Sequence, residues 1–345
     1  MYRPWSNPGH SIKYVEDTVF EEQGLKNRQV FRKRRELSRR SPEACPVHGQ
    51  RTDPREWRMR EVHMGRFLST DDVAYYTEQG YHFPIRALEP ERAERYRQLA
   101  EDAHQSGQGN SVTGDMRISF KLHLAYTWLD EMVHDPHVLD IVEDIIGPDI
   151  LVWSSALFMK NSGDGSFAAW HQDTNYSTLK GRDQVSIWIA LSPSKIESGC
   201  LRVIPGSHKV GRLLHEETGD MKNILARQER LVEDLDDSRA VDVELDPGEM
   251  SLHHLAMIHG SGRNDADYTR IGYAVRYIAP HVEPVGRHES VMLARGEDRY
   301  GYFELEPRPK ADLDADAVEA FKRAVEIRKS NFYDKEAEPA PASLG

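Results

Sequence analysis

Two segments, far apart in the sequence, carry side chains of the kinds that hold a metal ion. The first is AAWHQDTNY, which contains His171 and Asp173 two positions apart. Side chains of an extended chain alternate between its two faces, so an imidazole and a carboxylate at this spacing share one face and can bind one ion. The chain is acidic and has 16 histidines, so a His-x-Asp spacing is expected about once by chance. The pair alone is therefore weak evidence for a metal site, and it needs the support of the second segment.

The second segment, MSLHHLAMIHGSGRN, offers another imidazole at the end of an apolar run. His259 stands there directly before the turn Gly260–Gly262. Two neutral imidazoles and one carboxylate make the facial triad that suits non-haem iron(II) and leaves three coordination positions open. Two of these can take a bidentate 2-oxo acid and the third O₂, so the cofactor carries the chemistry and the protein supplies the geometry. We expect His171, Asp173 and His259 to be the metal ligands.

A permanently charged side chain follows on the next strand-like run. Arg270 stands 11 residues after His259, and its planar guanidinium matches a carboxylate with two hydrogen bonds. It is therefore expected to anchor the far carboxylate of 2-oxoglutarate. Alternation along the same run puts Arg276 on the same face. Arg276 either faces an anionic substrate or is buried in a pair with an acidic residue.

The same alternation selects three further candidates for the cavity. Trp188 lies on the inward face of QVSIWIAL, where it would either line the cavity or serve as an ordinary core residue. Lys160 ends the inward set of LVWSSALFMK, either as an anionic-ligand contact or as an exposed strand end. Of the neighbours His253 and His254 one must point inward, to line the pocket or to pack.

Helix signals precede these segments and strand signals surround them. One helix is expected from the cap at Ser69 to Gly80, a second from Pro90 to His104, and a third over 136–146. From Asp149 onward, short runs rich in β-branched and aromatic residues are separated by Gly, Pro and Ser clusters. Helices first and strands afterwards, without alternation, predict an α+β barrel or sandwich.

Composition and charge limit the class of protein. Lys and Arg number 45 against 57 Asp and Glu, a net charge of −12, which disfavours nucleic acid as a partner. No stretch reaches the roughly 18 to 20 apolar residues of a membrane span, and the N-terminus has no signal-peptide core. Two distant cysteines, Cys45 and Cys200, suit a reducing compartment, so a cytoplasmic protein is expected.

Composition and hydrophobic periodicity divide the chain into three parts. Residues 1–65 are charged and poorly periodic, with a basic run at 32–35, and are expected to be an arm or lid. Residues 66–333 are expected to form one folded domain. Residues 334–345 are small, polar and Pro-rich, and are expected to be disordered.

Over residues 67–280, the chain resembles the phytanoyl-CoA dioxygenase family of iron(II)- and 2-oxoglutarate-dependent oxygenases. The matching pieces stand in the family's order: LSTDDVAYYTEQGY, PHVLDIVEDIIGPDIL, WHQDTNY, VSIWIALSPSKIESGCLRVIPGSHK and IHGSGRN, followed by Arg270. The resemblance implies a double-stranded β-helix, a jelly-roll or cupin-like barrel, with helices packed on its major sheet.

The resemblance also assigns roles to single residues. It places the metal ligands at the three positions already chosen, and the contacts to the 2-oxoglutarate carboxylate at Arg270 and Ser261. Trp188 matches a tryptophan that lines the oxo-acid pocket, and Lys121 in FKLHL loosely matches a lysine near the cofactor. Asp173 stands where halogenating relatives have alanine or glycine, which favours hydroxylation.

These observations predict a dioxygenase that uses Fe(II), 2-oxoglutarate and O₂ to hydroxylate an unactivated C–H bond of a small molecule. Decarboxylation of 2-oxoglutarate would give succinate and CO₂. The substrate is expected to be a small molecule, anionic or carrier-bound. Two alternatives stay open: a non-redox cupin-like metalloenzyme with the same three ligands, and a catalytically silent metal-binding relative.

Overall fold

Two sheets bring the chemistry-bearing segments together in the computed structural model. It describes residues 67–106, 120–176, 179–233, 235–285 and 288–333, so the expected N-terminal arm and C-terminal tail lie outside the described residues. The larger sheet has the order β1-β10-β5-β12-β2-β14-β15 and the smaller has β3-β11-β6-β9. Neighbouring strands are antiparallel except β14 and β15, which are parallel.

The strands of the larger sheet are β1 (Tyr81–Arg86), β10 (Glu249–His253), β5 (Gln184–Ala190), β12 (Arg270–Ile278), β2 (Ile150–Lys160), β14 (Ser290–Arg295) and β15 (Glu304–Leu305). Those of the smaller sheet are β3 (Ala168–His171), β11 (His259–Ser261), β6 (Leu201–Val203) and β9 (Val241–Val243). Two short pairs complete the set: β13 (Glu283–Pro284) with β4 (Leu179–Lys180), and β7 (His215–Glu217) with β8 (Glu229–Leu231). The fold is therefore mixed, with helices and mostly antiparallel sheets.

The α-helices of the described part are α1 (Thr70–Gln79), α2 (Pro90–Gln105), α4 (Thr127–Val133), α5 (Pro136–Ile146) and α6 (Ala315–Tyr333). Three of the helices, α1, α2 and α5, begin and end within a residue or so of the predicted positions, whereas α4 and α6 were not predicted. Ser69 caps α1 in a reciprocal capping box with Asp72, and Gly80 ends it at φ 82°. Asp135 caps α5 by accepting hydrogen bonds from two first-turn N–H groups.

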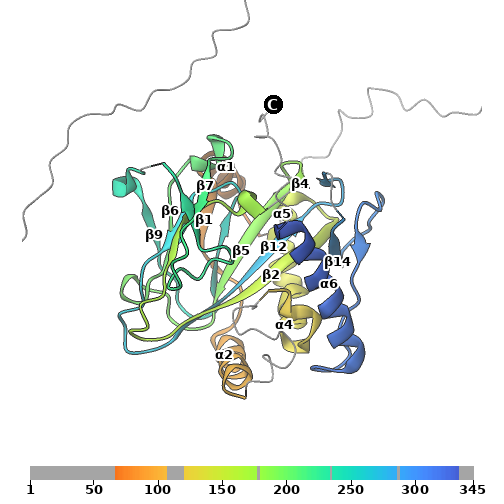
Figure 1. Ribbon diagram of the computed structural model, residues 1–345. Helices are drawn as coiled ribbons and strands as arrows, with labels where there is room; N and C mark the ends of the chain where they lie inside the picture. Colours follow the sequence, from red (N-terminus) through yellow and green to blue (C-terminus); the bar gives the residue numbers. More distant parts are fainter. Residues whose placement is uncertain (1–66, 107–119, 177–178, 234, 286–287, 334–345) are drawn as a thin grey trace, which may run out of the picture. The chain divides into compact units, whose positions relative to one another are not determined.

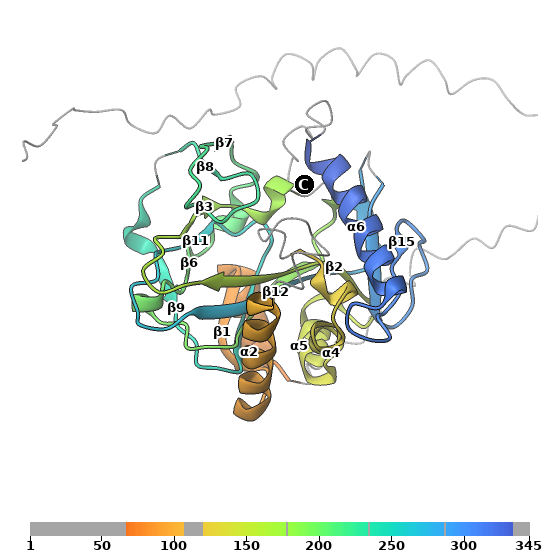
Figure 2. The ribbon, with the colours of Figure 1, turned by 60° about the horizontal axis from the view of Figure 1, so that its bottom comes forward.

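The larger sheet has one face against helices and the other against the smaller sheet (Figures 1 and 2). Ile187 and Tyr273 belong to a core that they share with Leu129 and Val142 of the helices. On the opposite face, Trp188 belongs to a second apolar cluster, whose other members include residues of the smaller sheet. The alternation predicted for β5 and β12 is thus confirmed. Burial of each aliphatic side chain contributes about 1.5–3 kcal/mol, which fixes the register of both strands.

Three elements depart from the sequence expectation. The expected order, helices first and strands afterwards, is wrong for α6, which follows all the strands. Helix α4 has seven residues and most of them are buried, so it lacks the polar face on which periodicity depends. Strand β1 contains Pro84, a residue that weakens a strand signal. Within the described part of the chain, no helix has both the length and the apolar character to cross a membrane.

Candidate metal centre

Antiparallel pairing of two short strands places the candidate ligands side by side. His171 of β3 stands opposite His259 of β11, and their ring centroids are 4.1 Å apart. Strand β3 ends at His171, so Asp173 projects from a following 3-10 turn and not from the extended chain that the spacing suggested. Its Oδ1 is nevertheless 3.9 Å from His171 Nε2. The ligand atoms of all three buried residues lie within 4.8 Å of one another.

Both imidazoles present the same nitrogen to the cluster. His171 Nδ1 is 2.8 Å from the Ala169 carbonyl and His259 Nδ1 is 2.9 Å from the Met257 carbonyl. A carbonyl only accepts, so each Nδ1 carries the proton and each Nε2 keeps its lone pair. Burial lowers the pKa of both rings, which keeps them neutral. Backbone carbonyls that fix the tautomer are the usual outer partners of metal-bound histidines, so these residues fit a metal ion.

The carboxylate of the cluster is held by a guanidinium across the cavity. Arg276 donates from Nε to Asp173 Oδ2 at 2.8 Å and from Nη2 to Oδ1 at 3.0 Å. Ser186 Oγ donates to Oδ2 at 3.2 Å. Burial raises the pKa of Asp173, but the charge of Arg276 and its hydrogen bonds outweigh burial and lower the pKa overall. Arg276 thus faces the cavity as predicted, but its partner is Asp173, which is the buried pairing left open above.

Gln172, which lies between His171 and Asp173, is hydrogen-bonded to the loop that contains Gly211 and Leu213. No pattern in the sequence selects it. Gln172 is fully buried. Its Nε2 donates to the carbonyls of Gly211 and Ala256, each at 2.8 Å, and its Oε1 accepts from Leu213 N at 2.8 Å. Its own N–H donates to His215 Nε2 at 3.1 Å. These partners are 39 to 84 residues away, so only the folded chain reveals them.

A cavity of about 160 Å³ runs past the three ligands, and its first end is cationic. Arg270 and Ser261 line it there, and the guanidinium carbon lies 5.1 Å from the Trp188 ring centroid. A side chain at Gly272 would strike that ring, since a Cβ would lie 1.9 Å from Trp188 Cζ2. Arg270 is 3% exposed, and its Nε has no hydrogen-bond partner among the described residues. Burial lowers its pKa to about 10, and no described carboxylate forms an ion pair with it.

Lys160 lies behind this end rather than on the cavity wall. It is fully buried and is not among the residues that line the cavity. Its Nζ lies 2.9 Å from Ser261 Oγ and donates to the carbonyls of Gly199, at 3.0 Å, and Gly262. The exposed strand end that the sequence allowed for Lys160 is therefore wrong, and direct contact with an anionic ligand in the cavity is not supported by its position behind the lining residues.

Lys121 is engaged elsewhere. Its Nζ pairs with Glu306 and donates to the Ser290 carbonyl at 2.7 Å. Both members of the ion pair are buried, and Lys121 is absent from the cavity lining. The loose match to a cofactor lysine therefore has no support in the described geometry.

The second end of the cavity is aromatic. His253 faces it, with its ring 4.9 Å from that of His259 and its Nδ1 without a partner. Arg328 reaches in from α6, with its guanidinium carbon 4.3 Å from the Trp153 ring and Nη1 3.6 Å from Glu289. Sequence reasoning missed Arg328 because α6 was not expected.

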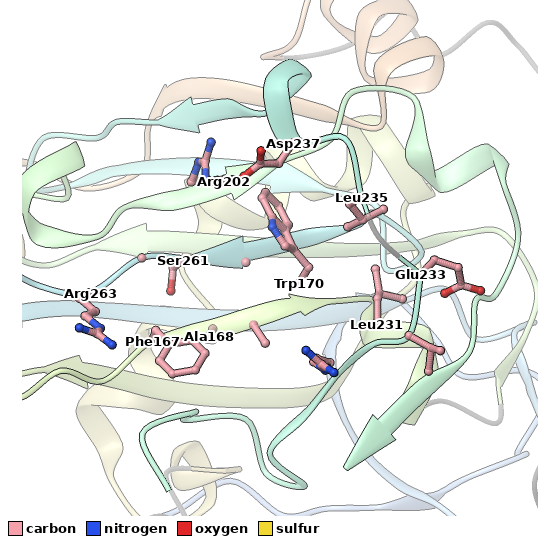
Figure 3. Close-up of a pocket in the computed structure, with 15 residues that line it drawn as sticks. Phe167, Ala168, Trp170, Arg202, Leu231, Glu233, Leu235, Asp237, Ser261 and Arg263 are labelled. Atoms are coloured by element: carbon pink, nitrogen blue, oxygen red, sulfur yellow. Dashed lines mark hydrogen bonds and ion pairs between the residues drawn. The ribbon is translucent and has the colours of Figure 1, made fainter. Parts of the chain in front are cut away.

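A second, open depression lies outside the smaller sheet (Figure 3). The Trp170 ring stands there 5.4 Å from the guanidinium carbon of Arg202, which also pairs with Asp237 and Asp242. Ser261 borders both cavities. The depression contains none of the three candidate ligands, so the chemistry is assigned to the inner cavity.

Comparison with known proteins places the chain in a family. The family model described as phytanoyl-CoA dioxygenase (PhyH) matches residues 63–272. A probable phytanoyl-CoA dioxygenase of Caenorhabditis elegans is 26% identical over 301 residues, 78% of this chain and 96% of that protein. A probable alpha-ketoglutarate-dependent hypophosphite dioxygenase of Stutzerimonas stutzeri is 27% identical over 180 residues, 50% and 62% of the two chains.

Two solved structures are also similar. The non-heme monooxygenase ThoJ in its apo form is 37% identical, with a TM-score of 0.66 and coverage of 75% of this chain and 96% of that one. CytC3 with Fe(II) and alpha-ketoglutarate has a TM-score of 0.53 at 23% identity, covering 71% and 96%, and supports the fold alone. The family model covers more than half of the sequence, and the chain belongs to the phytanoyl-CoA dioxygenase family.

Proposed function

We propose that the protein is an iron(II)- and 2-oxoglutarate-dependent dioxygenase that hydroxylates an unactivated C–H bond of a small molecule. The observation that carries this proposal is a buried His-Asp-His cluster in the same cavity as a guanidinium that has no carboxylate partner in the part of the chain that the structure describes. When bound, iron(II) with 2-oxoglutarate and O₂ supplies the oxidation, with release of succinate and CO₂. The name of the Stutzerimonas stutzeri relative, an alpha-ketoglutarate-dependent dioxygenase, supports it.

The protein's own task at the metal is to hold three donors still. His171 and His259 offer Nε2 because backbone carbonyls occupy their Nδ1 protons. Asp173 stays ionised and fixed because Arg276 and Ser186 bind its oxygens. Two imidazoles and one carboxylate suit iron(II) and leave positions for a chelating oxo acid. A carboxylate at Asp173 occupies the position that a halide would need, which favours hydroxylation over halogenation.

The co-substrate belongs at the cationic end. A buried, uncompensated charge is expensive, and an anionic ligand removes that cost. Arg270 has the charge and the fork geometry for the far carboxylate of 2-oxoglutarate, while Ser261 can donate a further hydrogen bond and the Trp188 ring forms the wall.

The substrate belongs at the aromatic end. Phe120 and Trp153 line it, and both rings lie beside the guanidinium of Arg328. Its two arginines both stand beside carboxylates, Asp173 and Glu289. An apolar, uncharged part of the substrate is therefore proposed to lie next to the metal, in place of the anionic group expected from Arg276. A cavity of about 160 Å³ suits the reacting end of a substrate, so a carrier or other large remainder would stay outside it.

The two sheets are proposed to be the walls of a double-stranded β-helix within an oxygenase domain over 66–333. The support is that the cavity is lined by both sheets: by β2, β5 and β12 of the larger and by β3, β6 and β11 of the smaller. Side chains from facing sheets converge on one interior in barrels of this kind.

Succinate release tests the proposal. The protein is incubated with Fe(II), 2-oxoglutarate and O₂, with and without a panel of apolar small molecules and carrier-bound acyl groups. We expect substrate-stimulated succinate that is abolished in His171→Ala and Asp173→Ala and kept in His104→Ala, a change at an exposed histidine of α2.

The other outcomes of this assay contradict the metal assignment or favour the alternative functions. Full turnover in either ligand variant contradicts the metal assignment. Metal binding at the three residues without any O₂-dependent succinate favours the non-redox cupin-like enzyme. Metal binding without turnover of any kind favours a silent relative.

A further inference from the structure

A second buried basic side chain, Lys160, lies behind Arg270 at the cationic end of the cavity. Arg270 and Lys160 are directly paired across β12 and β2, and both are almost completely buried. Like charges this close repel each other. Of the groups around the amine, Arg270 on β12 is cationic, Cys200 is a neutral thiol at ordinary pH, and Asp164 lies on the loop after β2. No described carboxylate forms an ion pair with either of these two side chains.

The three partners of Lys160 allow two arrangements of protons. Two of them, the carbonyls of Gly199 and Gly262, can only accept. The third is Ser261 Oγ, which can accept or donate. A charged ammonium has three N–H bonds, so it donates to all three and leaves the Ser261 hydrogen free. A neutral amine has two N–H bonds and one lone pair, so the carbonyls take both hydrogens and the Ser261 hydrogen points at the amine.

The backbone at Gly199 packs closely against the amine. Gly199 has φ +67°, and a Cβ there would lie 2.4 Å from the Gly262 carbonyl oxygen and 2.8 Å from Lys160 Nζ. Ser261 is also the only one of the three partners that lines the inner cavity. The Ser261 hydroxyl is therefore the one of these three groups that joins the Lys160 amine to the cavity.

We propose that Lys160 is a positioning residue for the co-substrate, which takes up a proton when a carboxylate binds beside Arg270 and thereby turns the Ser261 hydroxyl toward that carboxylate. The inference rests on the proposed function, since it needs 2-oxoglutarate at this end. The proton comes from solvent, one per carboxylate bound, and no bond between heavy atoms changes. Burial and the charge of Arg270 lower the pKa of Lys160 to about 6, so the amine is mostly neutral at pH 7.5 before the ligand arrives. The new anion favours the charged form.

Calorimetry in buffers of different ionisation enthalpy measures this proton directly. The protein, loaded with Mn(II) so that no turnover occurs, is titrated with 2-oxoglutarate at pH 7.5. We expect an uptake of nearly one proton per ligand, falling toward zero below about pH 5.5, where Lys160 is already charged. The same titration with 2-oxobutyrate, which lacks the far carboxylate, should show no uptake.

Variants locate the proton. In Lys160→Met the uptake should vanish and the affinity for 2-oxoglutarate should fall at least tenfold, while the affinities for 2-oxobutyrate and Mn(II) stay within twofold. Lys195→Met is the matched control, because Lys195 lies on the neighbouring loop and is paired with Asp246. It should behave as the wild type. In a Ser261→Ala background the effect of Lys160→Met should shrink at least threefold, since the hydroxyl that transmits it is gone.

Four results would overturn the inference. Normal binding of 2-oxoglutarate to the wild type without proton uptake refutes it and leaves the proposed function intact; this measurement needs no variant. Unchanged uptake in Lys160→Met places the proton elsewhere. Equal losses for both oxo acids in Lys160→Met indicate a purely structural residue. No binding of 2-oxoglutarate at all contradicts both the inference and the proposed function.

Discussion

Two arginines of β12 line the cavity in opposite electrostatic environments. Arg270 and Arg276 lie on one strand and one face. Arg276 is bound by both oxygens of Asp173, whereas Arg270 lies over Trp188 with no carboxylate in the described structure. The described chain therefore provides a carboxylate for Arg276, next to the candidate metal ligands, but none for Arg270. A buried cation without a counter-charge in the protein is expected where a ligand brings the anion.

The difference between Arg270 and Arg276 should also affect how much each contributes to the free energy of unfolding. Removing one partner of a buried ion pair costs about 3–5 kcal/mol, whereas replacing a lone buried charge by an apolar group can stabilise. Functional sites commonly keep such unfavourable charges at the expense of stability. The two arginines should thus respond with opposite signs to the same substitution.

Arg270→Leu gives the largest expected effect. Loss of charge-assisted hydrogen bonds to the far carboxylate should raise the KM for 2-oxoglutarate by about 100-fold, or about 3 kcal/mol. The melting temperature of the ligand-free protein should stay the same or rise. Steady-state kinetics and thermal unfolding measure the two quantities, and a large loss of stability with an unchanged KM would show that Arg270 is only a structural residue.

Arg276→Leu should show the reverse balance. Asp173 would be left buried without its guanidinium, so the metal-free protein should lose about 3–5 kcal/mol. Outer partners of metal ligands typically contribute 10–100-fold to metal affinity, and we expect a loss of this size. Denaturant unfolding and metal titration measure both. If its KM for 2-oxoglutarate rises as much as in Arg270→Leu, the contrast between the two ends is wrong.

Lys121→Met separates a structural lysine from a cofactor lysine. Glu306 would lose its buried partner, so unfolding should become easier by about 3–5 kcal/mol. The KM for 2-oxoglutarate, measured on folded protein, should hardly change. A KM increase larger than tenfold would restore the cofactor role that the resemblance implied. The double variant Lys121→Met with Glu306→Leu should recover part of the stability.

Glu229 of β8 is the opposite case to Arg270, because it is a buried acid with no ion-pair partner among the described basic residues. It is 1% exposed, its Oε1 has no partner, and burial raises its pKa to about 7. The unfolded pKa is near 4.5, so the folded state binds more protons between these values and stability falls as pH rises from 4.5 to 7. The shift corresponds to about 3 kcal/mol.

Glu229→Gln removes this titration. The variant should gain stability over the wild type as pH rises through the same window, with little difference below pH 4.5. Unfolding curves at several pH values measure it. A constant difference between the two proteins at all pH values would place the carboxyl in an environment that leaves it ionised.

Local signals in the sequence predicted most of what depends on neighbours along the chain. The caps at Ser69 and Gly80 and the alternation along β12 are confirmed, because hydrogen bonding at helix ends and the strand period act over a few residues. The three candidate ligands also converge in one cluster, which the two short motifs suggested together.

Pairings across long separations could not be predicted in the same way. Arg276 meets Asp173 across 103 residues and Lys121 meets Glu306 across 185, and such contacts depend on strand register and on how the elements pack. Arg328 was missed for this reason as well, since its place at the cavity follows from the packing of α6. One turn, from His171 to Asp173, also differs from the extended chain that the spacing suggested.

The most direct measurement is an anaerobic absorption titration of the protein with Fe(II) and then 2-oxoglutarate. Chelation of iron(II) by a 2-oxo acid gives visible absorption, so we predict a saturable band with one equivalent of each. It should be lost in His259→Ala, and in Arg270→Leu it should need about 100-fold more 2-oxoglutarate. A wild-type protein without the band, or a His259→Ala variant that keeps it, would contradict the account.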